Sequence, residues 1–198
     1  VPRICDMSSD FLSAPGHYPR FAMIYADAQK NIGPAGVTVV ILRDTLLADA
    51  PADLPAFLDY RAQIAAHSIL NSPPVFAIYV VLLVTRWLLG EIGGLAAMER
   101  VNTAKAALLY RALDDSDGFY AGHAAPADRS KMNVVFKLPT PELEATFIAA
   151  ARAAGFSGLG GHRSIGGIRA SIYNGLTFGA VEKLVDFMDG FRRQAPRP

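Results

Sequence analysis

At 198 residues, 52% of them hydrophobic, the chain is long enough for one large or two small domains with a sizeable core. Nineteen basic and eighteen acidic residues leave a formal net charge of +1. No basic tract with interleaved aromatic residues is present, which argues against a nucleic-acid partner. Cys5 is the only cysteine, which argues against a disulfide framework or a thiolate metal site and favours a reducing compartment.

Short runs of β-branched or aromatic residues predict strands at 4–7, 21–25 and 37–42, and residues 48–60 predict a loop. The segment Asn71-Ser72-Pro73-Pro74 offers cap residues and prolines for a first helical turn. A helix apolar nearly all round, and therefore buried, is predicted from there to Gly90. Its apolar run is shorter than the roughly 20 residues that span a bilayer, so we expect no membrane partner. No charged segment followed by an apolar stretch opens the given sequence, so we expect a cytoplasmic protein.

A second helix is predicted from Gly93-Gly94 to residues 114–118, with a core face formed by Leu95, Met98, Val101, Leu108 and Ala112. Residues 132–138 alternate as a strand, Thr140 caps a helix that ends at Gly155, and residues 168–173 predict a strand. A last helix has the core stripe Val181, Leu184, Val185, Met188 and Phe191. We therefore expect an α/β unit at residues 1–93 and a small α+β domain at residues 94–198.

The chain begins Val1-Pro2-Arg3-Ile4 without an initiator Met and runs straight into a predicted core strand. This start is typical of a fragment. We expect a missing upstream part to cover the faces of the first sheet, and the isolated chain to be less stable or less active than its parent.

Lys30 lies in the turn-forming run Ala28-Gln29-Lys30-Asn31-Ile32-Gly33-Pro34, 24 residues after Asp6 at the end of the first predicted strand. An amine on a rigid turn and a carboxylate at a strand end are the groups that hold pyridoxal phosphate, so the pair predicts such an enzyme. A lysine taken alone is most often solvated, and an aspartate at a strand end is most often a cap. The Gly/Pro-rich turn behind Lys30 favours the functional interpretation of that residue.

Five ordered blocks resemble the phosphoserine aminotransferase family, and they cover nearly the whole chain. The blocks are Cys5-Asp6-Met7-Ser8-Ser9, Ala28 to Gly36, Asn71-Ser72-Pro73-Pro74, Arg129 to Val134 and Gly161 to Asn174. The resemblance implies the C-terminal part of a homodimeric enzyme with an aspartate-aminotransferase-like fold: the end of the cofactor domain followed by a small C-terminal domain. It also implies pyridoxal 5'-phosphate as cofactor, and a place in serine and pyridoxine biosynthesis.

The same resemblance implies the roles of the site residues. Lys30 forms the Schiff base and moves the proton, while Asp6 pairs with the protonated pyridine nitrogen. Gln29 helps to hold the cofactor phosphate. Asn71 and Ser72 reach the cofactor phosphate of the other subunit, although a simple helix cap is an equally good interpretation of these two residues from the sequence.

The implied substrates are phosphoserine with 2-oxoglutarate, and 3-phosphohydroxypyruvate with glutamate. Arg169 is the candidate clamp for the α-carboxylate, because a guanidinium makes two parallel hydrogen bonds to such a group. His162 and Arg163 are candidates for the distal phosphate or carboxylate, on a loop framed by Gly161, Gly166 and Gly167. His17, His67 and His123 lack metal-ligand spacing, so we predict no metal site.

Two alternatives stay open at this point. One is another aminotransferase or lyase of the same fold that uses the same lysine. The other is a non-catalytic dimerisation or binding remnant. One residue departs from the family's motif: Asp27 stands three positions before Lys30, where a small residue such as glycine is expected.

Overall fold

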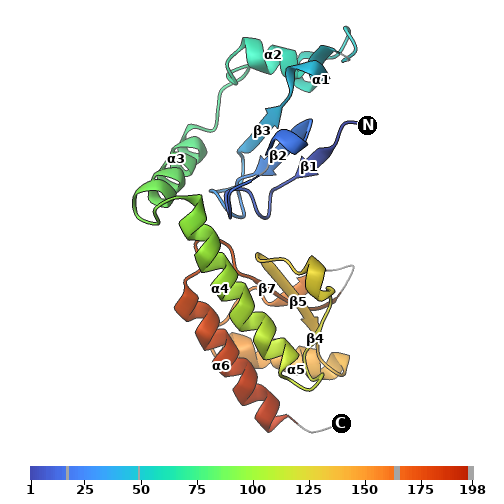
Figure 1. Cartoon of the computed structure of the whole chain (residues 1–198), viewed down its shortest axis with the longest axis vertical. Helices are drawn as coiled ribbons and strands as arrows, with labels where there is room; N and C mark the ends of the chain where they lie inside the picture. The colour runs from blue at the N-terminus through green and yellow to red at the C-terminus, as the bar shows by residue number, and fades with distance from the viewer. Residues whose placement is uncertain (17, 49, 163–165, 196–198) are drawn as a thin grey trace. The chain divides into compact units, whose positions relative to one another are not determined.

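The computed structural model describes residues 1–16, 18–48, 50–162 and 166–195. The chain divides into two compact units, Val1–Leu95 and Ala96–Pro198 (Figure 1). This division lies close to the boundary expected after residue 93. The assignment of the two units to a cofactor domain and a small C-terminal domain stays a prediction.

The first unit contains a three-stranded mixed sheet. Its strands are β1 (Ile4–Asp6), β2 (Met23–Asp27) and β3 (Thr38–Leu42), in the order β1-β2-β3. β1 is parallel to β2, and β3 is antiparallel to β2. The three strands predicted from the sequence are confirmed, with boundaries that differ by one to two residues.

The predicted loop at 48–60 contains one 3-10 turn and lies between two short helices. α1 (Asp44–Ala48) precedes it, and a 3-10 turn, η2 (Ala56–Leu58), lies inside it. α2 (Tyr60–Ala65), which the sequence analysis did not predict, follows. The Asp59 side chain starts α2 by accepting a hydrogen bond from the Arg61 amide at 2.9 Å, as an N-cap does. The 3-10 turn η1 (Tyr18–Arg20) connects β1 to β2.

Helix α3 (Val75–Gly90) forms where the apolar segment predicted a helix, but the prediction that it is buried is wrong. Only Ala77 and Leu88 are buried, whereas Phe76 is 76% exposed and Leu89 is 72% exposed. A helix that is apolar on every side needs partners on every side. Val81 packs on the small core of this unit, which is formed by Phe11, Ala26, Ala28 and Ile32, but most of the helix lacks such a partner within the described residues. The chain itself therefore leaves most of the α3 surface uncovered.

The start of α3 also differs from the prediction. Pro74 occupies the N-cap position and no side chain caps the helix, so Asn71 and Ser72 are not helix caps. Among the described residues, no single helix is long and apolar enough to cross a membrane, although α3 and the helix after it pass that test when taken together as a bent pair.

The second unit is a four-stranded antiparallel sheet with helices on one face (Figure 1). The strand order is β4-β5-β7-β6, formed by β4 (Ala121–Gly122), β5 (Asn133–Lys137), β6 (Gly160–His162) and β7 (Gly166–Ser171). A third 3-10 turn, η3 (Pro126–Asp128), lies between β4 and β5. The helices are α4 (Leu95–Asp114), α5 (Pro141–Ala153) and α6 (Phe178–Gln194).

The core of the second unit follows the predicted alternation. Met132, Val134, Phe136 and Leu138 are all buried, and Thr140 caps α5 by accepting from the Leu143 amide at 3.2 Å. The stripe predicted for α6 is confirmed. Val181, Leu184 and Met188 are buried, and Val185 and Phe191 are half-buried against the core.

The predicted core face of α4 is partly wrong. Met98 is buried as expected, but Val101 is 37% exposed, and Asn102 and Lys105 take buried positions on the helix. Asn102 donates to the Asn174 side chain at 2.8 Å. The Lys105 ammonium donates to the carbonyls of the segment after β7, those of Ile172, Tyr173 and Leu176, at 2.8–3.0 Å. A hydrophobicity pattern counts polar residues as solvent-facing, so it misses a buried face whose polar groups are satisfied.

Lys105 makes the stability of this unit depend on pH. Burial lowers the pKa of Lys105 from 10.5 to about 8. The unfolded chain therefore binds the proton more tightly, so the folded state gains stability as pH rises from about 8 to 10.5. Methionine at position 105 does not titrate. We therefore expect the free energy of unfolding of the wild type, measured relative to that of Lys105→Met, to rise by at most roughly 3 kcal/mol across this window.

Urea unfolding of both chains at closely spaced pH values measures this difference. A difference that falls as pH rises would show that the three carbonyl acceptors hold the ammonium form more strongly than burial disfavours it.

Candidate functional site

Asp6 and Lys30 lie at the same edge of the first sheet. β1 and β2 run parallel with Asp6 beside Tyr25, so the chain leaves both strands at this edge. The Met7 amide donates to the Tyr25 carbonyl at 2.8 Å and extends the pairing by one residue. The carboxyl ends of neighbouring parallel strands are the usual place for ligand-binding side chains in such sheets.

The Asp6 carboxylate is held by Ser8, which the sequence analysis did not single out. The Ser8 amide donates to Asp6 Oδ1 at 2.9 Å, and the Ser8 hydroxyl donates to the same oxygen at 2.6 Å. Ser8 is buried, and its Oγ accepts from the Asp27 amide at 3.1 Å, which fixes the hydroxyl against β2. An Asp followed two residues later by Ser is typical of an Asx turn, and this signal was present in the sequence.

These contacts keep Asp6 ionised. The Ser8 hydroxyl, then the Ser8 amide, hold the pKa of Asp6 below its ordinary value, and the Tyr25 hydroxyl and the Lys30 charge act in the same direction. The negative charge of Asp6 in turn raises the pKa of Tyr25. The edge therefore presents a fixed carboxylate next to a phenol and an amine.

Lys30 stands on a tight turn after β2, as predicted. The amides of Ile32 and Gly33 both donate to the Ala28 carbonyl, at 3.2 and 2.8 Å. Ala28 and Ile32 are buried, whereas Gln29 and Lys30 are exposed. The turn thus buries its apolar positions and turns its amine outward.

Contacts with the β1–β2 connection and with α3 hold this turn in place. The Asn31 side chain donates to the Phe11 carbonyl at 2.7 Å inside the small core. A Cβ on Gly33 would come within 2.8 Å of a Val81 methyl, so only glycine permits this approach to α3. Lys30 Nζ donates to Ser9 Oγ at 3.4 Å. The tight turn and these side-chain bonds together restrict where the amine can point.

The structure gives the unexpected Asp27 a partner. Its carboxylate accepts a hydrogen bond from the Thr38 hydroxyl across the β2–β3 pair, and its amide bonds Ser8. The side chain is thus engaged with β3, and its backbone supports the group that holds Asp6.

Asn71 and Ser72 are exposed in the segment before α3. Among the described residues, no hydrogen bond links either side chain to Asp6, Gln29 or Lys30; Asn71 Nδ2 contacts only the neighbouring Ser72 carbonyl, at 3.4 Å. The chain alone does not bring these two residues into the site.

Arg169 lies on β7 in the second unit, on the face of the sheet that the helices do not cover. Its neighbours Ile168 and Ala170 are buried in the core, so the alternation places Arg169 on the other face. Its Nε atom is buried and has no hydrogen-bond partner in the described part of the chain. A buried guanidinium nitrogen without an acceptor is suited to an anionic ligand.

The same face carries a polar network that the sequence analysis missed. Asn133 Oδ1 accepts from the Ser171 hydroxyl and from the Tyr173 hydroxyl, both at 3.1 Å. Asn133 pairs with Ser171, and residues 171 and 173 are an even number of positions from Arg169, so these side chains lie on the same face as Arg169. Alternation between apolar and polar positions along 168–173 was the signal that could have found them.

His162 ends β6 and pairs with Gly166, but its side chain, like the whole of Arg163, lies outside the described residues. Of the three glycines around them, Gly161 and Gly167 lie where the backbone approaches closely. A Cβ on Gly161 would meet the Gly166 carbonyl oxygen at 2.0 Å, and one on Gly167 would meet the Phe136 carbonyl oxygen at 2.7 Å. Larger residues do not fit at either position.

Within the described ranges, no group of three or more His, Cys, Asp or Glu side chains is placed to hold a metal ion. The edge formed by Asp6, Ser8 and Lys30 instead offers a fixed negative charge and a primary amine. These are groups that fit pyridoxal phosphate: the carboxylate can accept a hydrogen bond from a protonated ring nitrogen, and the amine can condense with an aldehyde.

The chain matches the family model "Aminotransferase class-V" over residues 3–184. It is 56% identical over 194 residues to the phosphoserine aminotransferase of Geobacillus kaustophilus, covering 98% of this chain and 54% of that protein. The Bacillus subtilis phosphoserine aminotransferase is 48% identical with the same coverage of both chains. The chain thus spans about half the length of the curated relatives it matches.

Solved structures show the same relationship. The phosphoserine aminotransferase from Bacillus circulans subsp. alkalophilus matches with a TM-score of 0.93 and 49% identity, over 98% of this chain and 53% of that one. A pyridoxal-phosphate-bound phosphoserine aminotransferase from Trichomonas vaginalis matches with a TM-score of 0.89 and 38% identity, over 96% of this chain and 54% of that one. The mixed α/β fold of this chain is therefore one that these enzymes share.

Proposed function

The chain belongs to the class-V aminotransferase family, and on this premise we propose that the protein carrying it is a pyridoxal-phosphate-dependent phosphoserine aminotransferase. The proposed reaction interconverts 3-phosphohydroxypyruvate plus glutamate with phosphoserine plus 2-oxoglutarate, a step of serine biosynthesis. The observation that carries the proposal is the placement of a hydrogen-bonded Asp6 carboxylate and an outward Lys30 amine on one sheet edge. The identity to named relatives over 98% of the chain supports it.

Pyridoxal phosphate, when bound, supplies an aldehyde that condenses with amines and a ring that accepts electrons from the substrate α-carbon. The residues of this chain supply the rest. The Lys30 amine is the nucleophile that tethers the cofactor and the base that moves the α-proton. Asp6, kept charged by Ser8, holds a proton on the ring nitrogen. Exposed Gln29 is placed beside Lys30 to contact the cofactor phosphate.

We assign substrate binding to the second unit. Arg169, whose buried Nε lacks a partner among the described residues, is suited to clamp the α-carboxylate of either substrate. His162 and Arg163 stay candidates for the distal phosphate or side-chain carboxylate. The polar network around Asn133 lies on the same sheet face and places further hydroxyl and amide groups there.

The proposed assembly is a homodimer in the cytoplasm with a shared active site. Exposed Asn71 and Ser72, which among the described residues make no hydrogen bond to the Asp6–Lys30 edge of their own chain, are placed to serve the partner's cofactor phosphate. The uncovered apolar surface of α3 supports the view that the isolated chain lacks surroundings needed for activity. The placement of this chain as the C-terminal part, ending in a small domain, stays part of the proposal.

The substrate assignment is tested by kinetics on the complete polypeptide. We expect kcat/KM for 3-phosphohydroxypyruvate to exceed that for hydroxypyruvate by about 10²-fold or more, because a site built to bind a phosphate leaves its cationic groups unpaired when the substrate lacks that phosphate. Equal values for the two keto acids would reject the phosphorylated substrate and favour another aminotransferase of the same fold.

A further inference from the structure

The Lys30 amine has a hydroxyl within hydrogen-bonding distance. Lys30 Nζ donates to Ser9 Oγ at 3.4 Å, which joins the turn after β2 to a residue 21 positions earlier. Among the described residues, the amine makes no other hydrogen bond and no ion pair. Because the lysine side chain is a flexible four-carbon stem, its amine keeps one position only where such a contact holds it.

Two further cross-links join the same two segments, one on each side of this contact. On one side the Asp27 amide donates to Ser8 Oγ at 3.1 Å. On the other side the Asn31 side chain donates to the Phe11 carbonyl at 2.7 Å. The hydroxyl and the amine therefore lie between two fixed points of the backbone.

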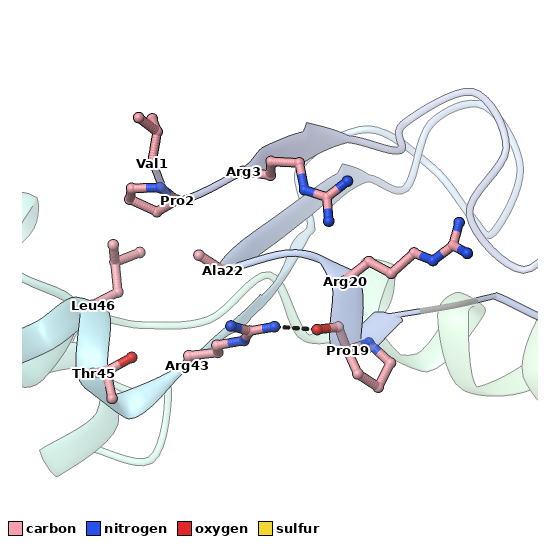
Figure 2. A pocket seen from close by; sticks show the side chains of 9 residues that line it. All are labelled: Val1, Pro2, Arg3, Pro19, Arg20, Ala22, Arg43, Thr45 and Leu46. Carbon is pink, nitrogen blue, oxygen red and sulfur yellow. Dashed lines mark hydrogen bonds between the residues drawn. The ribbon is translucent and has the colours of Figure 1, made fainter.

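The connection between β1 and β2, which carries this hydroxyl, is anchored at both ends. After β1 the amides of Asp10 and Phe11 both donate to the Met7 carbonyl, at 3.1 and 2.8 Å. Before β2 the Arg43 guanidinium donates to the Pro19 carbonyl in η1 (Figure 2). The connection thus has anchors of its own and presents the hydroxyl from a fixed turn.

We propose that Ser9 is a positioning residue for Lys30, an inference that rests on the proposed aminotransferase function. Its hydroxyl accepts an N–H of the amine while that nitrogen is not bonded to the cofactor, and so restricts the directions in which the lone pair can point. No bond forms or breaks at Ser9. The substrate α-proton passes to the Lys30 nitrogen, and the electron pair of the broken C–H bond is accepted by the cofactor ring.

Nuclear magnetic resonance of the complete polypeptide without cofactor, labelled with carbon-13 at the lysine Cε atoms, measures whether the hydroxyl holds the amine. We expect the Lys30 Cε–H group to be restricted on the picosecond-to-nanosecond timescale in the wild type and more mobile in Ser9→Ala. Lys183, exposed on α6, is the internal reference and should relax alike in both proteins. Equal mobility of Lys30 in the two proteins would overturn the proposal.

Kinetics of the cofactor-loaded polypeptide provide a second readout. Ser9→Ala should lower kcat by about three- to tenfold, the equivalent of one hydrogen bond, and leave KM for glutamate and the cofactor absorbance unchanged. The kinetic isotope effect with α-deuterated glutamate should rise, because removal of the α-proton becomes slower relative to the other steps.

Conservative variants separate the hydroxyl from the shape of the side chain. Ser9→Thr and Ser9→Val have the same branched shape and differ in the hydroxyl, so strain in the turn is common to both. The threonine variant should have the higher kcat and the less mobile amine, and this pair decides the matter if the alanine variant does not fold. Ser157→Ala, at an exposed loop position, is the matched control and should change neither readout.

Failure of this inference is distinct from failure of the proposed function. A complete wild-type polypeptide that shows no cofactor absorbance rejects the aminotransferase function and the inference with it. If the wild type carries the cofactor on Lys30 but Ser9→Ala keeps the wild-type isotope effect, or threonine and valine at position 9 behave alike, the inference alone is rejected.

Discussion

Lys30→Ala is expected to abolish the visible absorbance that pyridoxal phosphate confers on the complete polypeptide, because the variant has no amine on the turn at the end of β2. Turnover should fall by about 10²–10⁴-fold, the usual contribution of a positioned base. Absorbance spectroscopy with added cofactor, followed by steady-state kinetics, measures both.

Two control variants separate the chemistry of the amine from its charge. Lys30→Arg keeps a cation at the turn, but a guanidinium does not condense with an aldehyde, so it should fail as alanine does. Lys183→Ala, at an exposed position on α6, should keep the spectrum and the rate. A chromophore that persists in Lys30→Ala would place the reactive amine elsewhere.

Asp6→Asn is expected to lower kcat by on the order of 10²-fold or more, since loss of a fixed charge at a reacting group typically costs this much. The amide keeps the shape of the carboxylate and leaves Ser8 a partner, but it cannot hold a proton on a ring nitrogen by charge. Cofactor content should change little, so kinetics and absorbance of the same samples separate binding from catalysis.

Ser8→Ala provides a graded comparison with Asp6→Asn. It keeps the carboxylate but removes the largest cause of its lowered pKa, so the pKa of Asp6 should rise toward its ordinary value. A carboxylate with a lowered pKa protonates only at acidic pH, so the variant should act normally near neutral pH and lose rate at a higher pH than the wild type. An unchanged acid limb would show that Ser8 does not control Asp6.

The sequence predicts those parts of the fold whose signals are local. Alternation from Met132 to Leu138 needs only one buried sheet face, and the Thr140 cap needs only the next three residues. Asp6 and Lys30 were found for a related reason: a strand end and a turn are both local features, and parallel pairing brings them to one edge.

Features that depend on distant partners were not predictable in this way. The prediction that α3 is buried was wrong because an apolar pattern shows that a helix needs partners, but it does not show that the chain contains them. Lys105 sits on the core face of α4 because carbonyls 67 to 71 residues away satisfy it. The short strands β4 and β6 contain several glycines and carry too little side-chain pattern for a prediction.

Borohydride reduction of the complete polypeptide with pyridoxal phosphate, followed by peptide mapping, tests the central claim most directly. The claim is that the edge formed by the ends of β1 and β2 holds the cofactor through Lys30. The reduced cofactor should be found on the peptide that contains Lys30 and on no other. A label on a different lysine, or none under conditions in which the protein is folded, would contradict the account.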